Sequence, residues 1–151
     1  MIRSVIPFLL VSIVASVPAF GEKTGPASAK APIINFSLPT FTNPDGYRSW
    51  LIRGSEAWLT EQNVIDVQGL ALTVFSGDAS NRIDTILLSP SARVLTEQQV
   101  ISGTSSMRVI NIRDGFEASG EEWRYTHKDK TVTLGKKARV VLRAEFKNFL
   151  K

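Results

Sequence analysis

From Gly46 to its end the chain alternates between short runs of β-branched or aromatic residues and turn residues. No other feature limits the possible folds as strongly. Breaks such as "SGDASN", "SP", "SGTSS", "RDG", "HKDK" and "LGKK" recur about every 8 to 12 residues. Only the last turn, "AEFKNFLK", has an apolar spacing near that of an amphipathic helix. We therefore predict an all-β domain, with strands at 48–53, 57–60, 64–75, 82–89, 93–101, 107–112, 116–118, 122–126, 131–134 and 138–144.

Within these strands neither face is strictly polar. In "RIDTILL", Ile83, Thr85 and Leu87 share one face, but Ile86 lies on the other. Two interpretations fit this pattern: a sandwich core with a few surface aliphatic residues, or a sheet whose second face also meets something apolar. The three tryptophans, Trp50, Trp58 and Trp123, all lie in expected strands, where each could bury a large area.

The first 45 residues have a different composition. Residues 1–21 carry one basic residue, Arg3, then an apolar run and a small-x-small pair at Ala19 and Gly21, which is typical of a secretory signal cleaved after Gly21. The alternative is a short uncleaved anchor, although the apolar run of 16 residues is shorter than the roughly 20 that cross a bilayer. We interpret residues 22–45 as a flexible tether, with room for one edge strand at 33–36, and residues 46–151 as the domain.

Composition excludes several classes of protein. The chain has no cysteine, so it has no disulfide and cannot be a lipoprotein, whose lipobox requires one. Residues 1–21 hold one basic and no acidic residue, which leaves 17 Lys and Arg against 14 Asp and Glu in the rest. That small excess does not indicate nucleic-acid binding.

Catalytic and metal-binding patterns are weak. His127 is the single histidine and lies in the turn "THKDK", so we interpret it as a solvated turn residue and predict no metal site. The carboxylates Asp66, Asp84, Glu121 and Glu122 have no spacing that favours an acid and base pair, and we interpret them as parts of solvated faces. We expect neither an enzyme nor a cofactor.

The C-terminal end is basic. From Gly135 to Lys151 there are six positive residues against one acidic residue. Basic residues on a terminal strand discourage unwanted sheet pairing, but such a strand can also pair with a chosen partner or offer its charges to phosphate groups. Both interpretations remain open, and the candidate contacts are Lys136, Lys137, Arg139 and Arg143.

The order "DGYRSWLIRGSEA", "VQGLALTVFSGD", "DTILLSPSARV" and "VISGTSSMRVINIRDGFEASGEEWRYTHKDKTVTLGKKARVVL" resembles the OstA-like family of lipopolysaccharide-transport proteins, which includes the periplasmic component C and the soluble bridge component A. The resemblance covers about residues 40–145. The positions that match the family's recurring pattern are Gly120, Trp123, Tyr125, Val132, Leu134, Val140 and Leu142.

The resemblance implies a β-jellyroll or β-taco of two antiparallel sheets around a groove for acyl chains. It also implies a periplasmic protein that accepts lipopolysaccharide from an inner-membrane ABC transporter complex and passes it to a second OstA-like jellyroll protein, joined through an edge strand. A retained N-terminal segment would tether it to the inner membrane. The groove candidates are Trp50, Ile52, Leu70, Leu72, Ile83, Leu87, Val109, Trp123, Tyr125, Val140 and Leu142.

A second hypothesis is an exported β-sandwich that binds carbohydrate or protein. It predicts a closed core without a groove, and exposed tryptophans, Trp50 or Trp58, that stack on sugars.

Overall fold

The computed structural model describes residues 31–142, and all regular structure in this range is β. This confirms the predicted all-β class. The described range contains no helix long and apolar enough to cross a membrane. Residues 1–21, assigned to a signal or anchor, lie outside it, as does Arg143. The strands are β1 (Ile33–Phe41), β2 (Arg48–Glu61), β3 (Val64–Phe75), β4 (Ile83–Leu95), β5 (Val100–Gly103), β6 (Met107–Asn111), β7 (Phe116–Thr126) and β8 (Thr131–Leu142).

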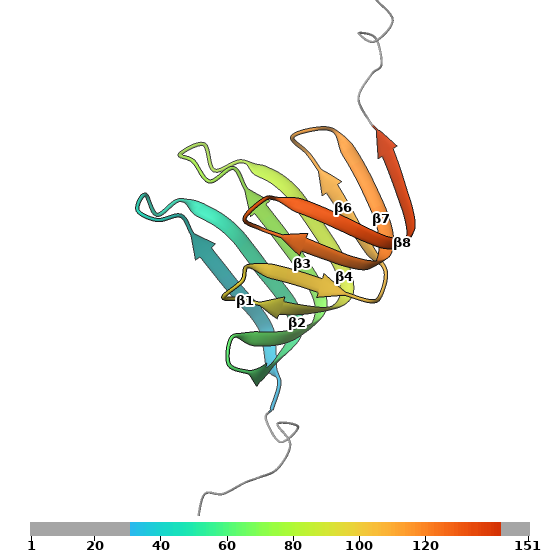
Figure 1. Cartoon of the computed structure of the whole chain (residues 1–151). Helices are drawn as coiled ribbons and strands as arrows, with labels where there is room; N and C mark the ends of the chain where they lie inside the picture. The colour runs from blue at the N-terminus through green and yellow to red at the C-terminus, as the bar shows by residue number, and fades with distance from the viewer. Residues whose placement is uncertain (1–30, 143–151) are drawn as a thin grey trace, which may run out of the picture.

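The strands form one hydrogen-bonded antiparallel sheet (Figure 1). Consecutive strands pair from β1 to β4, and β8 pairs with β7. Between β4 and β7 lie two short strands: β5 pairs with one end of each neighbour and β6 with the other end. The pairings β4–β5, β5–β7, β7–β6 and β6–β4 thus close a circuit within the sheet.

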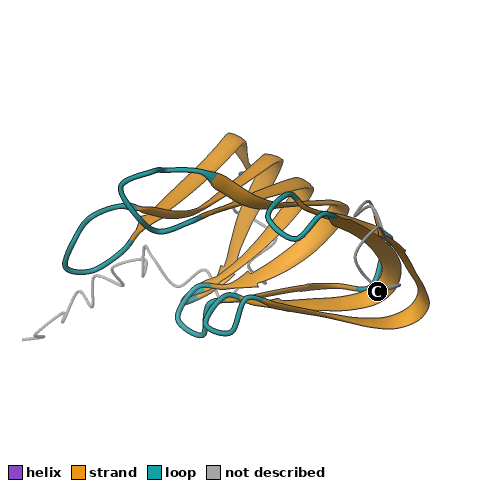
Figure 2. Ribbon diagram, turned by 90° about the horizontal axis from the view of Figure 1, so that it is seen from above, coloured by secondary structure: helices purple, strands orange, loops and turns teal. Residues whose placement is uncertain are grey.

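The sheet bends sharply across the middle of its strands, along a line that we call the crease. The pairing of neighbouring strands is interrupted at Asn35 in β1, at Ser55 in β2, at Gly69 in β3 and at Pro90 in β4. The crease continues through the gap between β5 and β6 and then near Glu122 in β7 and Gly135 in β8. Figure 2 shows the sheet bending back so that two layers face each other. The two sheets that we predicted are halves of this single sheet.

Backbone conformation explains the crease. Gly69 has φ 63°, in the left-handed region that glycine adopts without steric cost. Three other strand residues, Asn35, Glu122 and Lys137, also have positive φ, at 54°, 52° and 50°. Isolated left-handed residues bend a strand and interrupt its ladder.

The crease corrects several predicted strand ends. The breaks expected at "SP" and at "LGKK" lie inside β4 and β8, and the gaps between the expected strands 48–53 and 57–60 and between 116–118 and 122–126 lie inside β2 and β7. Each of these strands continues through the bend, because it resumes pairing with one neighbour on the other side: β2 and β4 with β3, and β7 and β8 with each other. Gly, Ser and Pro mark bends here as well as turns.

The N-terminal boundary also differs from the prediction. β1 lies within the segment 22–45 that we interpreted as a tether, and it is longer than the edge strand expected at 33–36. Phe36 and Leu38 pack against the core while their neighbours face outward, so alternate apolar side chains hold this strand on β2.

The core lies between the two layers. One layer contributes Ile52, Leu72 and Leu87, and the other contributes Val67 and Val94, all of them fully buried. Side chains from both inner faces interdigitate here as in a β-sandwich. The region between the layers is therefore closely packed around β2, β3 and β4.

Candidate functional site

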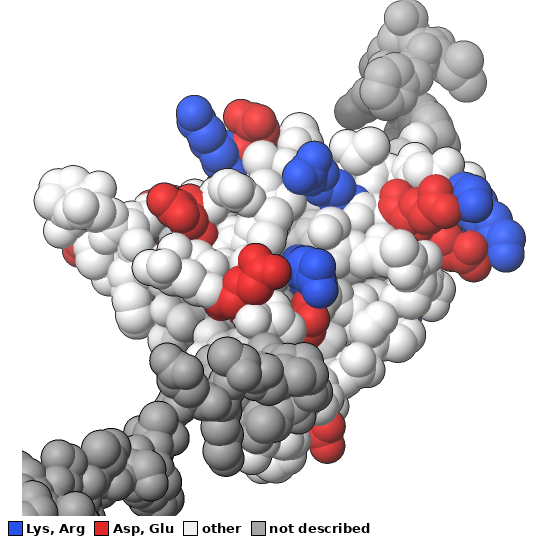
Figure 3. Space-filling view, turned by 60° about the horizontal axis from the view of Figure 1, so that its bottom comes forward, with Lys and Arg blue, Asp and Glu red and all other residues white. Residues whose placement is uncertain are grey.

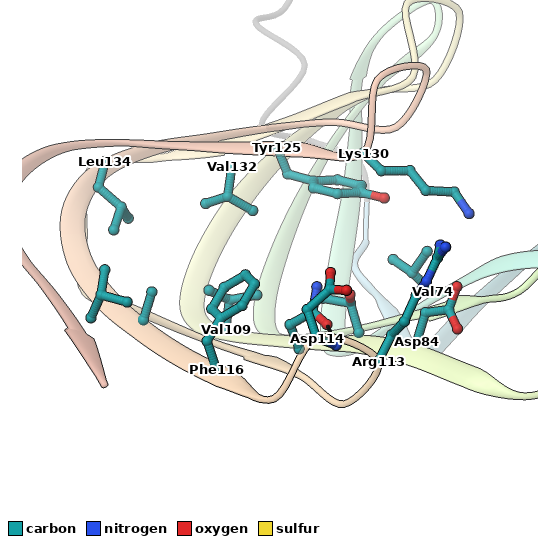
Figure 4. Close-up of a pocket in the computed structure, with 14 residues that line it drawn as sticks. Val74, Asp84, Val109, Arg113, Asp114, Phe116, Tyr125, Lys130, Val132 and Leu134 are labelled. Carbon is teal, nitrogen blue, oxygen red and sulfur yellow. Dashed lines mark hydrogen bonds between the residues drawn. The ribbon is translucent and has the colours of Figure 1, made fainter. Parts of the chain in front are cut away.

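A cavity of about 280 Å³ opens between the layers at the other end of the sheet, around β6, β7 and β8. Val109, Phe116 and Ala118 line it from one layer, and Tyr125, Val132 and Leu134 line it from the other (Figure 4). The fold thus leaves an unfilled apolar space where β7 and β8 turn through the crease. The complete lining is Val74, Asp84, Thr85, Val109, Asn111, Arg113, Asp114, Phe116, Ala118, Tyr125, Lys130, Val132, Leu134 and Val140.

Four charged residues lie on one side of this cavity, and we call them the charged rim: Asp84, Arg113, Asp114 and Lys130 (Figure 4). Asp84 is only 8% exposed. Our interpretation of this residue as part of a solvated face is wrong. Its backbone oxygen accepts a hydrogen bond from the Ile112 N–H at 2.8 Å, and the turn after β6 covers it.

A polar cluster borders the cavity beside Tyr125, and we call it the His127 cluster: Ser49, Trp50, Tyr125 and His127. The His127 Nδ1 lies 2.8 Å from the Tyr125 hydroxyl, and its Nε2 lies 2.7 Å from the Ser49 Oγ. The Trp50 ring stacks on the imidazole at a centroid distance of 4.6 Å. Since Ser49 and Trp50 begin β2 while His127 follows β7, the cluster ties the two layers together.

The interpretation of His127 as a solvated turn residue is also wrong, because the side chain is 9% exposed. Burial, together with the positive charge of Lys130, lowers the pKa of His127 from 6.5 to about 4. Burial also raises the pKa of the Tyr125 hydroxyl. At neutral pH the imidazole is therefore uncharged, and one ring nitrogen donates a hydrogen bond while the other accepts one.

The structure separates the predicted groove residues into three groups. Three line the cavity: Val109, Tyr125 and Val140. Six are buried in the packed core and do not line it: Trp50, Ile52, Leu70, Leu72, Leu87 and Trp123. The last two, Ile83 and Leu142, are exposed: Ile83 begins β4, just before a register shift, and Leu142 ends the edge strand.

Several lining residues were absent from the groove prediction. Val132 and Leu134 match the family pattern and alternate in "TVTLG", so period-two reading of β8 could have found them. Val74, Phe116 and Ala118 carry the same alternation. Whether such a residue lines the cavity or packs in the core depends on the residues that the opposite layer places across from it. Strand periodicity does not specify those residues.

The basic residues of β8 are largely paired. The Lys136 Nζ lies 2.9 Å from the Glu122 carboxylate, and the Lys137 Nζ lies 3.2 Å from that of Glu121. Arg139 is exposed, and Arg143 lies outside the described residues. On the face that Figure 3 displays, acidic and basic side chains lie next to each other and are not gathered by sign.

The tryptophans do not form an exposed platform. Trp50 is 3% exposed and Trp123 2% exposed, and Trp58 is partly buried. The carbohydrate-binding hypothesis predicted exposure of Trp50 or Trp58 and a closed core, and the buried Trp50 and the cavity both differ from it.

Two comparisons with known proteins found no relative. A scan of the sequence against models of protein families found no match, and a search of curated proteins found none. Within residues 31–142, no group of three or more His, Asp or Glu side chains is placed to hold a metal ion.

Proposed function

We propose that this protein carries lipid in the periplasm as an OstA-like β-jellyroll, accepting lipopolysaccharide from an inner-membrane ABC transporter and passing it toward the outer membrane. The observation that carries this proposal is the apolar cavity between the two layers. Enclosing acyl chains between apolar side chains is favourable by about 25 cal/mol for each Å² of apolar surface removed from water.

The contrast between the two ends of the sheet supports a ligand space. Around β2, β3 and β4 the layers are packed with fully buried side chains such as Ile52, Leu72 and Val94. Around β6, β7 and β8 equally apolar residues face each other across empty space. A domain that served only as a rigid spacer would be more stable with this space filled.

The open edges of the sheet support a role in a chain of similar domains. Among the described strands, β1 pairs only with β2 and β8 pairs only with β7. The two free edges differ in sequence, so a different protein could pair with each edge. Exposed apolar residues lie on both: Ile34 and Phe41 on β1, and Val140 and Leu142 on β8. We propose the transporter complex and a second jellyroll protein as these partners.

Photo-crosslinking tests the lipid assignment. A photoreactive phenylalanine derivative at Phe116 places its reactive group in the cavity, and the same derivative at the exposed Tyr47 provides the matched control. We expect lipopolysaccharide to crosslink at position 116 and not at 47. Equal crosslinking at both positions, or none at 116 in a folded variant, would contradict the proposal.

A further inference from the structure

Asp84 is a largely buried residue that lines the cavity. It is 8% exposed, and within residues 31–142 its side chain forms neither a hydrogen bond nor an ion pair. Its backbone is held in place, since the Ile112 and Arg113 N–H groups lie 2.8 and 3.4 Å from its carbonyl oxygen. The carboxylate oxygens of Asp84 are not among the fully buried polar atoms, so a ligand in the cavity can reach them. A cationic or hydrogen-bond-donating ligand would satisfy them.

The rest of the charged rim offers both signs of charge. Arg113 and Asp114 come from the turn between β6 and β7, and Lys130 comes from the turn between β7 and β8. In the part of the chain that is described, none of these three side chains forms an ion pair. Figure 4 shows them with Asp84 on the same side of the cavity, while the apolar residues Val132, Leu134 and Phe116 lie deeper.

We propose that the charged rim binds a zwitterionic head group of the phosphoethanolamine type, with one acyl chain of the same lipid in the cavity. The ammonium group would contact Asp84 and Asp114, and the phosphate would contact Arg113 and Lys130. A head group with negative charge alone would bring that charge beside two carboxylates. This inference rests on the proposed function, because it assumes that the cavity holds an acyl chain.

The size of the cavity indicates one chain. Pockets for small ligands usually measure roughly 300–1,000 Å³, and the cavity measures about 280 Å³. Several chains would require the layers to separate, and the His127 cluster opposes such a separation by joining β2 to the turn after β7. The cavity as it stands therefore holds one acyl chain, either that of a monoacyl amphiphile or one of the chains of a larger lipid.

Calorimetric titration of the protein with two short-chain monoacyl lipids tests the proposal. Lysophosphatidylethanolamine and lysophosphatidylglycerol of equal chain length, both below their aggregation concentration, differ only in the head group. We expect the ethanolamine lipid to bind about tenfold more tightly, which is the effect of one charge-assisted hydrogen bond. We expect Asp84→Asn to abolish this preference by weakening that lipid alone. Asp45→Asn, an exposed aspartate outside the cavity lining, is the matched control and should preserve it.

A second variant keeps the test independent of the folding of Asp84→Asn. Lys130 is exposed, and Lys130→Gln should weaken the binding of both lipids alike, because both carry the phosphate. Equal affinity of the native protein for the two lipids overturns the head-group assignment and leaves lipid binding intact. Failure to bind either lipid overturns both the head-group assignment and the proposed lipid binding. Lipopolysaccharide with and without phosphoethanolamine substituents then distinguishes a glycolipid source from a membrane phospholipid.

Discussion

At the scale of single residues, His127 controls how the two layers meet. Its imidazole is stacked on Trp50 and lies at hydrogen-bonding distance from Tyr125 on one side and from Ser49 on the other, so contacts with both β2 and β7 depend on one uncharged ring. Protonation would force one ring nitrogen that accepts a hydrogen bond to become a donor. The fold is therefore coupled to pH through this residue.

The free energy of unfolding should fall as the pH is lowered from about 7 toward 4. The unfolded chain protonates its histidine near the ordinary pKa of 6.5, whereas the folded state resists until about 4, so protons favour unfolding within this window. At 1.36 kcal/mol per pKa unit, the difference between 6.5 and about 4 corresponds to about 3 kcal/mol, and solvent screening reduces the contribution of His127 to about 2 kcal/mol.

Urea unfolding at several pH values, compared between the native protein and His127→Gln, isolates this contribution from that of the carboxylates. The native protein should lose more stability than the variant between pH 7 and 4. If the two curves remain parallel, His127 does not titrate as described.

At the scale of the elements, the crease decides what the strands can enclose. A flat eight-stranded sheet has no interior, whereas strands that bend at Gly69, Pro90 and Glu122 bring alternate residues of one face together. The glycine at 69 is needed for two reasons: its φ is 63°, and a Cβ there would lie 2.9 Å from the Ser55 Oγ.

Gly69→Val should lower the free energy of unfolding by roughly 2 to 3 kcal/mol, because a β-branched residue is strained at positive φ. Gly69→Asn should cost only about 1 kcal/mol, since asparagine tolerates the left-handed region better. Urea denaturation measures both. Equal losses for the two variants would mean that the crowding by Ser55, and not the backbone, makes glycine necessary.

At the scale of the whole molecule, the open edges of β1 and β8 lie at opposite ends of the sheet (Figure 1). The described part of β8 carries one exposed arginine, Arg139, beside two lysines that already pair with Glu121 and Glu122. This arrangement leaves Arg139 available to a neighbouring protein.

We predict that Arg139→Glu reduces lipopolysaccharide hand-over in a reconstituted transporter assay severalfold, and that Arg143→Glu does the same. The stability of Arg139→Glu should change by about 0.5 kcal/mol or less, because exposed charges contribute little. Arg124→Glu makes the same charge change on β7, which is paired on both sides, and should leave hand-over unchanged. Loss of folding in Arg139→Glu would instead make this residue structural.

Local pattern in the sequence was enough for the all-β class and for the faces of Ile52, Leu72 and Val109, because alternation along a strand is a local property. It did not distinguish a turn from a bend at "SP" or "LGKK", since the same residue types serve both. Only the tertiary structure decided that Val109 faces empty space while Leu72 faces a packed layer, and that Asp84 and His127 are buried. The physical reason is that burial and cavities depend on what the opposite layer contributes, and the crease brings that layer from residues distant in the chain.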